Sequence, residues 1–525
     1  MSIETEPDPA RWRALALCLV AGFMTLLDVS IVNVALPSIR TGLGASESAI
    51  QWIIAGYALA FGIALVPAGR LGDARSRRAI FGIGLGLFTV ASAACGLATG
   101  PTWLSVTRVL QGLGAGIVSP QVSGFIQTMF SGRERGRAFG MFGATIGIST
   151  AIGPLLGGFI VKVGGVENGW RWVFLVNVPV GIVALLLVRR LLPSSTQRRK
   201  QSLDPVGVVL FGGAILFALL PLVTGDQDSL SNRSWWLLIP SALLLVAFGW
   251  WERMWDRRGA ATLVDLSLLR VRSFMLGLGL GTVYFGGFTS LFLVLTLYLQ
   301  EGLHYDALLA GVTSMPFAIG SAVSASLGGK FVYKFGRPMV VAGLVLVIIG
   351  LIGVDLVVGR VDQHVGAWLI VPLAVTGFGG GLVISPNVTL TLAEVDVRRA
   401  GSGGGMLQTA QRVGSAIGVA VVLAQFFSKL ASTHGDFAKA LSLGLRTTIG
   451  LVAAALVLGL VDLLTRRGHD TRAATRESEA TDREAEPAAV GAHAAAAAVE
   501  PEAPGDSRVE EPAPVSAVVG RHRKR

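Results

Sequence analysis

The sequence has 525 residues, of which 52% are hydrophobic and 15% are charged, and it contains 68 glycines. Soluble domains carry about 25% charged residues, so this composition excludes an ordinary soluble protein and indicates a membrane protein. The net charge of +11 would suit a nucleic-acid partner, but the basic residues are spread over loops, and we therefore expect no nucleic acid. Cys18 and Cys95 both lie in apolar runs, so we predict neither a disulfide framework nor a metal site.

Apolar runs of membrane-spanning length recur along the chain and predict fourteen transmembrane helices, because about 20 apolar residues cross a bilayer as a helix. The first run is too long for a signal-peptide core and has no small-residue cleavage site, so we interpret it as an uncleaved first span. The predicted spans are 14–36, 48–68, 79–99, 102–127, 138–161, 172–191, 204–224, 235–255, 273–299, 307–329, 338–358, 366–389, 404–428 and 443–465.

The distribution of lysine and arginine predicts the orientation of these spans. The N-terminus and every second loop hold most of the basic residues, and basic loops stay in the cytoplasm. Both termini are therefore expected in the cytoplasm, and the protein is expected in the cell membrane with many passes.

An internal repeat divides the spans into two sets of six. Gly69-x3-Asp73-x3-Arg77 after the second span returns as Gly329-x3-Tyr333-x3-Arg337 after the tenth. The repeat predicts an all-α membrane protein of two pseudo-symmetric six-helix bundles around a central cavity, an architecture typical of secondary transporters. The expected divisions are a cytoplasmic N-terminus 1–13, a first bundle 14–191, two inserted helices 204–255, a second bundle 273–465, and a tail 466–525 that is rich in Ala, Glu and Pro and that we expect to be disordered.

Asp28 is the acidic residue of the first span, and a charge at that depth costs several kcal/mol unless it is paired or protonated. Arg108 in the fourth span lies at a similar depth, about 9 Å from the outer end against about 12 Å for Asp28. Burial and ion pairing act on the carboxylate in opposite directions, so Asp28 is predicted to carry a proton and Arg108 to tune it. The alternative is a purely structural role for either residue.

Several motifs in order resemble the major facilitator superfamily, and specifically its fourteen-helix drug:proton antiporters. The motifs are Leu27-Asp28-x2-Ile31-Val32-Asn33-Val34-Ala35-Leu36-Pro37, Gly69-x-Leu71-x-Asp73-x3-Arg77-Arg78, Arg108-x2-Gln111-Gly112-x-Gly114-Ala115-Gly116, Gly147-x5-Gly153-Pro154-x2-Gly157-Gly158, and Trp170-Arg171-Trp172-x-Phe174-x2-Asn177-x-Pro179-x-Gly181. The resemblance covers residues 11–467.

The resemblance implies a cytoplasmic gate at Gly69, Asp73, Arg77 and Arg78. We expect Asp73 at the start of the third helix, capping its amides, and Arg77 and Arg78 to reach the other half or lipid headgroups. The alternative is that these arginines only fix the topology. The resemblance also assigns an antiporter motif to the fifth span, and its small residues imply a tight seam with the opposite half. The alternative is ordinary helix packing. Pro154 in this motif is expected to kink its helix. The motif residues are Gly147, Gly153, Pro154, Gly157 and Gly158.

Polar and aromatic residues inside apolar runs are candidates for a substrate cavity, because such residues usually face the interior of a bundle. Each could instead serve as contact between helices. The candidates are Asn33, Gln51, Trp52, Tyr57, Gln111, Tyr284, Phe288, Gln408, Gln411 and Arg412.

These observations predict a transporter rather than an enzyme, since no nucleophile–base set, metal spacing or phosphate-binding loop appears. We expect a monomer, without cofactors, that uses the proton gradient to export lipophilic or cationic drugs or antibiotics. The alternatives are export of an endogenous solute such as an amino acid, lipid or siderophore, a passive channel, and a membrane sensor or scaffold acting through the tail.

Overall fold

The computed structural model describes residues 10–165, 167–193, 204–224, 235–258, 262–264, 267–361, 363–396 and 399–465. It separates two units, Met1–Leu464 and Thr465–Arg525, and only Thr465 of the second is described. The predicted tail 466–525 and N-terminal residues 1–9 therefore lie outside the described residues.

The first unit is built of helices, and no strand occurs in the ranges just given. Its main helices are α1 (Ala10–Leu43), α2 (Glu47–Ala74), α3 (Arg77–Gly96), α4 (Pro101–Met129), α5 (Gly132–Gly164), α6 (Gly169–Leu175), α7 (Asn177–Leu191), α8 (Pro205–Thr224), α9 (Leu238–Arg257), α10 (Arg272–Leu297), α11 (Ala307–Phe335), α12 (Arg337–Arg360), α13 (Val365–Trp368), α14 (Ile370–Thr391) and α15 (Ala400–Ser432). A last helix covers Phe437–Thr465, 3₁₀ turns precede α9 and α10, and a π turn at Tyr298–Gly302 ends α10.

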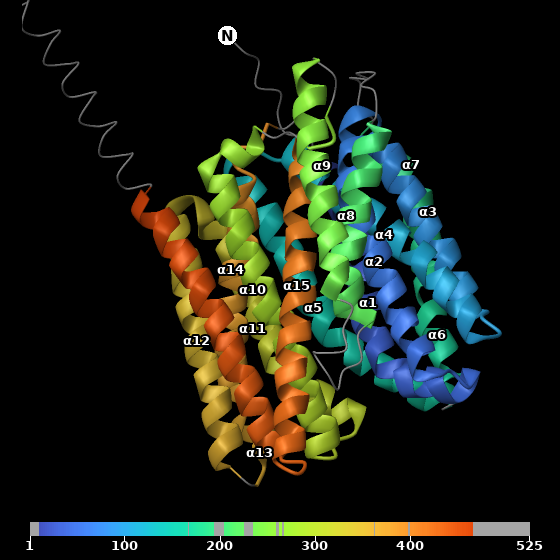
Figure 1. Ribbon diagram of the computed structural model, residues 1–525, viewed down its shortest axis with the longest axis vertical. Helices are drawn as coiled ribbons and strands as arrows, with labels where there is room; N and C mark the ends of the chain where they lie inside the picture. The colour runs from blue at the N-terminus through green and yellow to red at the C-terminus, as the bar shows by residue number, and fades with distance from the viewer. Residues whose placement is uncertain are drawn as a thin grey trace, which may run out of the picture. The chain divides into compact units, whose positions relative to one another are not determined.

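The helices form two halves that follow the repeat in the sequence (Figure 1). In the first half, α4 packs between α2 and α3, and α1 packs along α5. In the second half, α14 packs between α11 and α12, and α10 packs along α15. The halves meet where α5 contacts α11 and where α2 contacts α15. One end of the bundle, which we call the Ala10 end, holds the start of α1 and the turns that follow α2, α4 and α11.

Twelve helices of the described chain are long and apolar enough to cross a membrane. Each of the predicted spans coincides with a helix or a pair of consecutive helices, but the helices extend past the apolar runs because helix formation does not stop at the edge of the hydrocarbon. The two inserted helices, α8 and α9, are not among the twelve. The apolar part of α8, Pro205–Ala218, is short, and α9 ends in charged residues.

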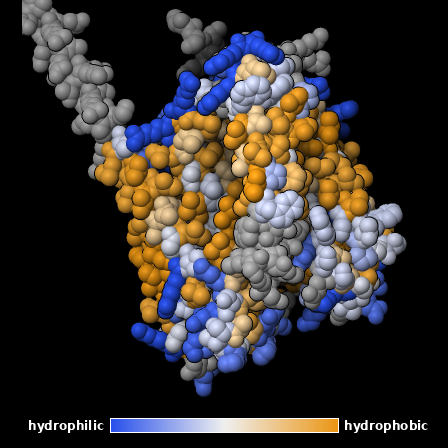
Figure 2. All heavy atoms as spheres, in the orientation of Figure 1, coloured by the Kyte–Doolittle hydropathy of each residue, from blue (hydrophilic) through white to orange (hydrophobic). Residues whose placement is uncertain are grey.

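Apolar side chains cover the flank of the bundle, and polar ones gather at its two ends (Figure 2). Many large hydrophobic residues of the described helices are exposed, among them Val90, Leu186 and Val246. A soluble protein with such an extended apolar surface would associate with other proteins, so this surface fits a lipid environment.

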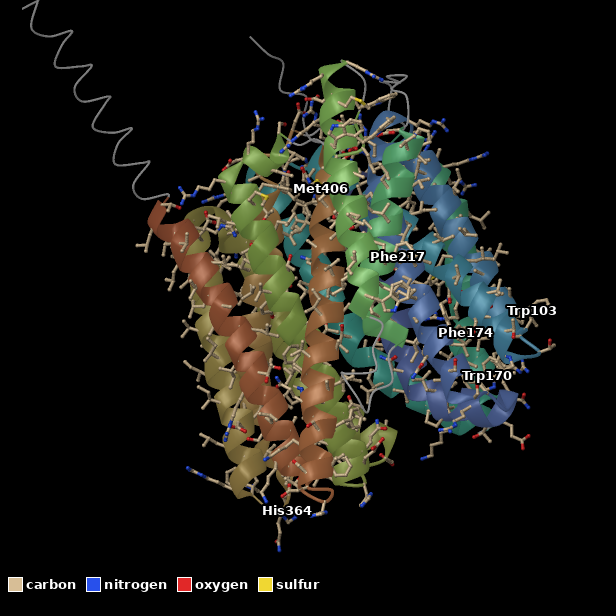
Figure 3. All side chains as sticks on the ribbon, viewed as in Figure 1. Trp103, Trp170, Phe174, Phe217, His364 and Met406 are labelled. Atoms are coloured by element: carbon tan, nitrogen blue, oxygen red, sulfur yellow. The ribbon has the colours of Figure 1, made fainter. Side chains whose placement is uncertain are left out.

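The inserted hairpin α8–α9 lies against the line where α2 meets α15. Ile215 of α8 packs with Leu59 of α2 and with side chains of α15, and Phe248 of α9 packs with Val66 of α2. Met406 of α15 lies beside this second cluster, and Figure 3 shows it toward the end of the bundle opposite to His364. The hairpin therefore contacts both halves.

Candidate functional site

Asp28 lies at the centre of a buried polar network inside the first half. Its carboxylate is fully buried and accepts a hydrogen bond of 2.5 Å from Arg108 Nη1. Gln111 Nε2 donates to the other carboxylate oxygen at 2.8 Å, and Asn177 Nδ2 donates to the same oxygen at 3.1 Å. These donors come from α4 and α7 and compensate a charge that would otherwise be too costly inside a membrane.

Arg108 is itself held by several groups. Its Nε donates to the carbonyl of Ile53 at 3.2 Å, and its Nη1 also reaches Gln111 Oε1 at 2.7 Å. Its guanidinium lies 4.2 Å from the centre of the Tyr57 ring, a cation–π contact. The Tyr57 hydroxyl donates to the carbonyl of Thr25 at 3.0 Å. The network is thus rigidly positioned, and Tyr57 connects it to α1.

A cavity of about 320 Å³ lies between the halves, a volume within the usual range for small-molecule sites. Its wall comes from α1, α4 and α5 on one side and from α10, α11, α14 and α15 on the other. It extends along the bundle from Leu392 and Gly404, between the end of α14 and the start of α15, to Gln300 after α10 and Ala310 at the start of α11. Thr25 and Val29 line it too, and Tyr57, which donates to the Thr25 carbonyl and contacts Arg108, links this wall to the Asp28–Arg108 pair.

The residues predicted for the cavity divide into two groups. Those on the wall are Asn33, Phe288, Gln408, Gln411 and Arg412. Those elsewhere are Gln51, Trp52, Tyr57, Gln111 and Tyr284. A polar residue in an apolar run can form its hydrogen bonds within its own half. Its position in the sequence alone therefore does not place it on the cavity wall.

Four of the predicted residues that lie off the cavity wall have other surroundings in the structure. Gln111 and Tyr57 belong to the Asp28 network. Tyr284 is buried in an aromatic cluster with Phe285 and Phe288, and Trp52 is exposed.

The Ala10 end of the cavity is closed by close contact between backbones. A Cβ at Gly136 of α5 would lie 2.5 Å from the carbonyl oxygen of Gly329 in α11, so both positions need glycine. On the other side, a Cβ at Gly69 of α2 would collide with the carbonyl of Gly401 in α15. The two equivalent glycines of the repeat, Gly69 and Gly329, therefore occupy equivalent places at the two contacts between halves.

Asp73 joins the halves at this end. It lies at the end of α2, and not at the start of the third helix as the sequence suggested. Its carboxylate accepts hydrogen bonds from Gly401 N at 3.0 Å, Ser402 N at 2.8 Å and Ser402 Oγ at 2.9 Å. It therefore satisfies the free amides at the start of α15 in the opposite half, where the helix dipole favours a negative charge.

The two arginines of this motif stay within the first half among the contacts that the structure gives. Arg77 pairs with Asp73 at 2.5 Å and is buried against Gly124. Arg78 donates to the carbonyl of Leu192 at 3.4 Å, just after α7. Arg77 is nevertheless linked to the start of α15 through Asp73, which both contact. That the two arginines reach the other half or lipid headgroups stays a prediction.

The small residues of α5 serve two different contacts. Gly147 faces Ser321 of α11 in the opposite half, whereas Gly153 and Gly157 face Ser30 and Ile31 of α1 in the same half. Pro154 lies within the helix and lines the cavity. Gly158 continues the same helix. Of these glycines, Gly147 thus contributes to the seam with the opposite half, and Gly153 and Gly157 pack within the first half.

Three residues of the Asp28 network and of the contact at Asp73 were not predicted from the sequence. Asn177 and Ser92 complete the Asp28 network, Ser92 by accepting from Gln111 Nε2 at 2.7 Å. Asn177 begins α7 one residue after α6 ends, and a polar amide in an apolar run was the available signal. Ser402, whose amide and hydroxyl bind Asp73, has no such signal because its partner is distant in sequence.

Two helical halves around a central cavity, with a buried charge pair beside it, define a membrane transporter rather than an enzyme. The family profile described as Major Facilitator Superfamily matches residues 18–419, and the chain belongs to this family. It is thus a multi-pass protein of the plasma membrane.

Relatives with assigned names support this membership. The chain is 38% identical to the probable actinorhodin transporter of Streptomyces coelicolor, over 81% of this chain and 74% of that one. It is 36% identical to puromycin resistance protein pur8 of Streptomyces alboniger (79% and 82%), and 33% identical to multidrug resistance protein Stp of Mycobacterium tuberculosis (78% and 76%).

Solved structures share the fold. The proton:xylose symporter XylE superposes with a TM-score of 0.61 at 15% identity, covering 86% of this chain and 95% of that chain. The human organic anion transporter MFSD10 superposes with a TM-score of 0.60 at 15% identity, covering 86% and 100%.

Proposed function

We propose that this protein is a proton-coupled exporter of lipophilic drugs or antibiotics that works by alternating access. The single observation that carries the proposal is the buried Asp28–Arg108 pair, which Tyr57 links to Thr25 on the cavity wall. The relatives named as antibiotic transporters and resistance proteins support the export of such compounds.

In this proposal the chain crosses the membrane fourteen times and functions as a monomer without a cofactor, its energy coming from the proton gradient. The Ala10 end is the cytoplasmic end, because the basic loops gather there. The helices α8 and α9 then supply the two additional crossings. In this proposal the described arrangement, in which glycine contacts close the Ala10 end, is the state closed to the cytoplasm.

Asp28 is proposed to carry the proton. While it is ionised, Arg108, Gln111 and Asn177 stabilise its charge. Protonation removes the attraction to Arg108 and leaves a buried guanidinium without its counter-ion, which is energetically costly. The cost is relieved if the helices move, and α1 and α4, which hold the pair, also line the cavity. Protonation at Asp28 is thereby linked to the shape of the cavity.

Gly69, Asp73, Arg77 and Arg78 are proposed to form the cytoplasmic gate. Opening it requires Asp73 to release the amides at the start of α15 and requires the glycine contacts to separate. Asp73 then exchanges these partners for water, so the gate can open at moderate cost.

The proposal is tested by measuring the accumulation of a panel of antibiotics in cells with and without the protein. We expect lower accumulation in cells that express it, and loss of this effect with a protonophore or with Asp28→Asn. Asp256→Asn, which removes an exposed carboxylate at the end of α9, is the matched control and should retain export. Full export by Asp28→Asn at equal amounts in the membrane would contradict the proposal.

A further inference from the structure

Arg412 of α15 is a positive charge on the wall of the central cavity. Its guanidinium carbon lies 4.4 Å from the centre of the Phe61 ring, and its neighbour Gln411 also lines the cavity. Among the described residues, the structure gives Arg412 no carboxylate within 4 Å and no hydrogen-bond acceptor, and the Phe61 ring is its recorded cation–π partner.

The charge of Arg412 is not neutralised by the rest of the site. The wall of the cavity includes no aspartate or glutamate within the described ranges. Asp28, the buried acid in this region, is already paired with Arg108. A cation–π contact compensates only part of the cost of a desolvated guanidinium. Among the described residues of its wall, the cavity thus holds one positive charge that no carboxylate faces.

Aromatic side chains form the wall contributed by α10. Phe285, Phe288 and Phe292 all line the cavity, with ring centres 5.6 Å apart for the first pair and 5.4 Å for the second. Phe142 of α5 lines the cavity from the other half. Such rings pack well against flat aromatic molecules through stacked or edge-on contacts.

We propose that Arg412 binds the acidic group of the exported compound, and that the cavity selects aromatic acids, bearing a carboxylate or phenolate, over aromatic cations. The guanidinium offers planar donors that match an oxyanion, and the phenylalanines receive the ring system. This inference rests on the proposed export function. It departs from the expectation of cationic drugs, because a cation in this cavity would meet a like charge and no carboxylate.

The test is a fluorescence titration of the purified full-length protein in lipid nanodiscs at pH 7.5. The probes share one ring system and differ in charge: anthracene-2-carboxylate, anthracene-2-carboxamide and 2-(trimethylammoniomethyl)anthracene. The wild-type protein should bind the carboxylate roughly tenfold or more tightly than the other two, as expected for a charge-assisted hydrogen bond in a desolvated site.

Arg412→Gln should weaken carboxylate binding by roughly tenfold or more while changing carboxamide binding less than about twofold, so the carboxamide reports whether the variant is folded. Arg412→Lys should recover part of the loss. Lys429→Gln removes a positive charge from the same helix away from the cavity wall and should change nothing.

Equal binding of carboxylate and carboxamide by the wild-type protein, or an equal loss of both in Arg412→Gln, would overturn the inference. Binding needs no proton gradient, so this outcome is separate from the fate of the export proposal. A preference for the acid without export in cells would overturn only the export function. Export of cations with no preference for acids would overturn only this inference.

Discussion

Asp73→Asn is expected to weaken the closed state of the Ala10 end without altering the fold of either half. Asparagine has nearly the same shape but keeps only one acceptor oxygen. The variant therefore loses one of the hydrogen bonds that the amides at the start of α15 donate to residue 73. A hydrogen bond to a charged acceptor contributes about 1.5–3 kcal/mol. The variant also loses a negative charge at a helix N-terminus, which contributes about 0.3–1 kcal/mol.

Together these losses amount to about 2–4 kcal/mol, which corresponds to a shift of roughly 30- to 700-fold toward the open state. The pair between Asp73 and Arg77 lies within one half, so its weakening affects both states and largely cancels. The shift is specific to the contact between halves.

The shift can be measured by double electron–electron resonance. Spin labels at Arg190→Cys and Lys334→Cys report on exposed positions near the ends of α7 and α11, one in each half. The buried Cys18 and Cys95 are first replaced by alanine. We expect one short distance in the parent protein and a second, longer distance in Asp73→Asn.

Glu134→Gln is the matched control. It removes a carboxylate at the same end whose partner, Arg11, belongs to the same half. This variant should keep the parent distance distribution. If Asp73→Asn also keeps it, the hydrogen bonds to α15 do not hold the halves together and the reasoning is refuted.

Two further predictions concern other parts of the chain. Asp462→Asn breaks the buried ion pair with Arg337, which also binds Asn387 Oδ1 at 2.6 Å, and should lower the free energy of unfolding by about 3–5 kcal/mol. The loss should appear as a lower melting temperature in detergent, whereas Asp436→Asn, which changes a partly exposed residue, should melt as the parent does. An unchanged melting temperature in Asp462→Asn would show that this pair is dispensable. Ending the chain at Thr465 should leave export intact in the accumulation assay, whereas complete loss of export would favour the scaffold alternative.

The sequence predicts the helices well because each membrane crossing needs a long apolar run, and that requirement is local. Their ends are less predictable, as α1 shows by extending from Ala10 to Leu43 around a predicted span of 14–36. The proximity of Asp28 and Arg108 could be predicted because two charged residues at similar depth have few other partners.

Contacts between distant segments could not be predicted. Asp73 was expected to cap the helix next to it, but its partners begin a helix more than 300 residues later. Tyr57 and Gln111 resembled cavity residues, yet each satisfies its polar group within its own half. In each case the deciding partner lies far away in sequence.

The central claim, that Asp28 exchanges a proton as cargo moves, is tested most directly in proteoliposomes by recording internal pH and cargo uptake together. The account predicts that an imposed proton gradient drives cargo uphill, that protons flow in the opposite direction to the cargo, and that Asp28→Asn abolishes both. Uphill movement of cargo with no accompanying proton flux, or proton-coupled movement that persists in Asp28→Asn, would contradict it.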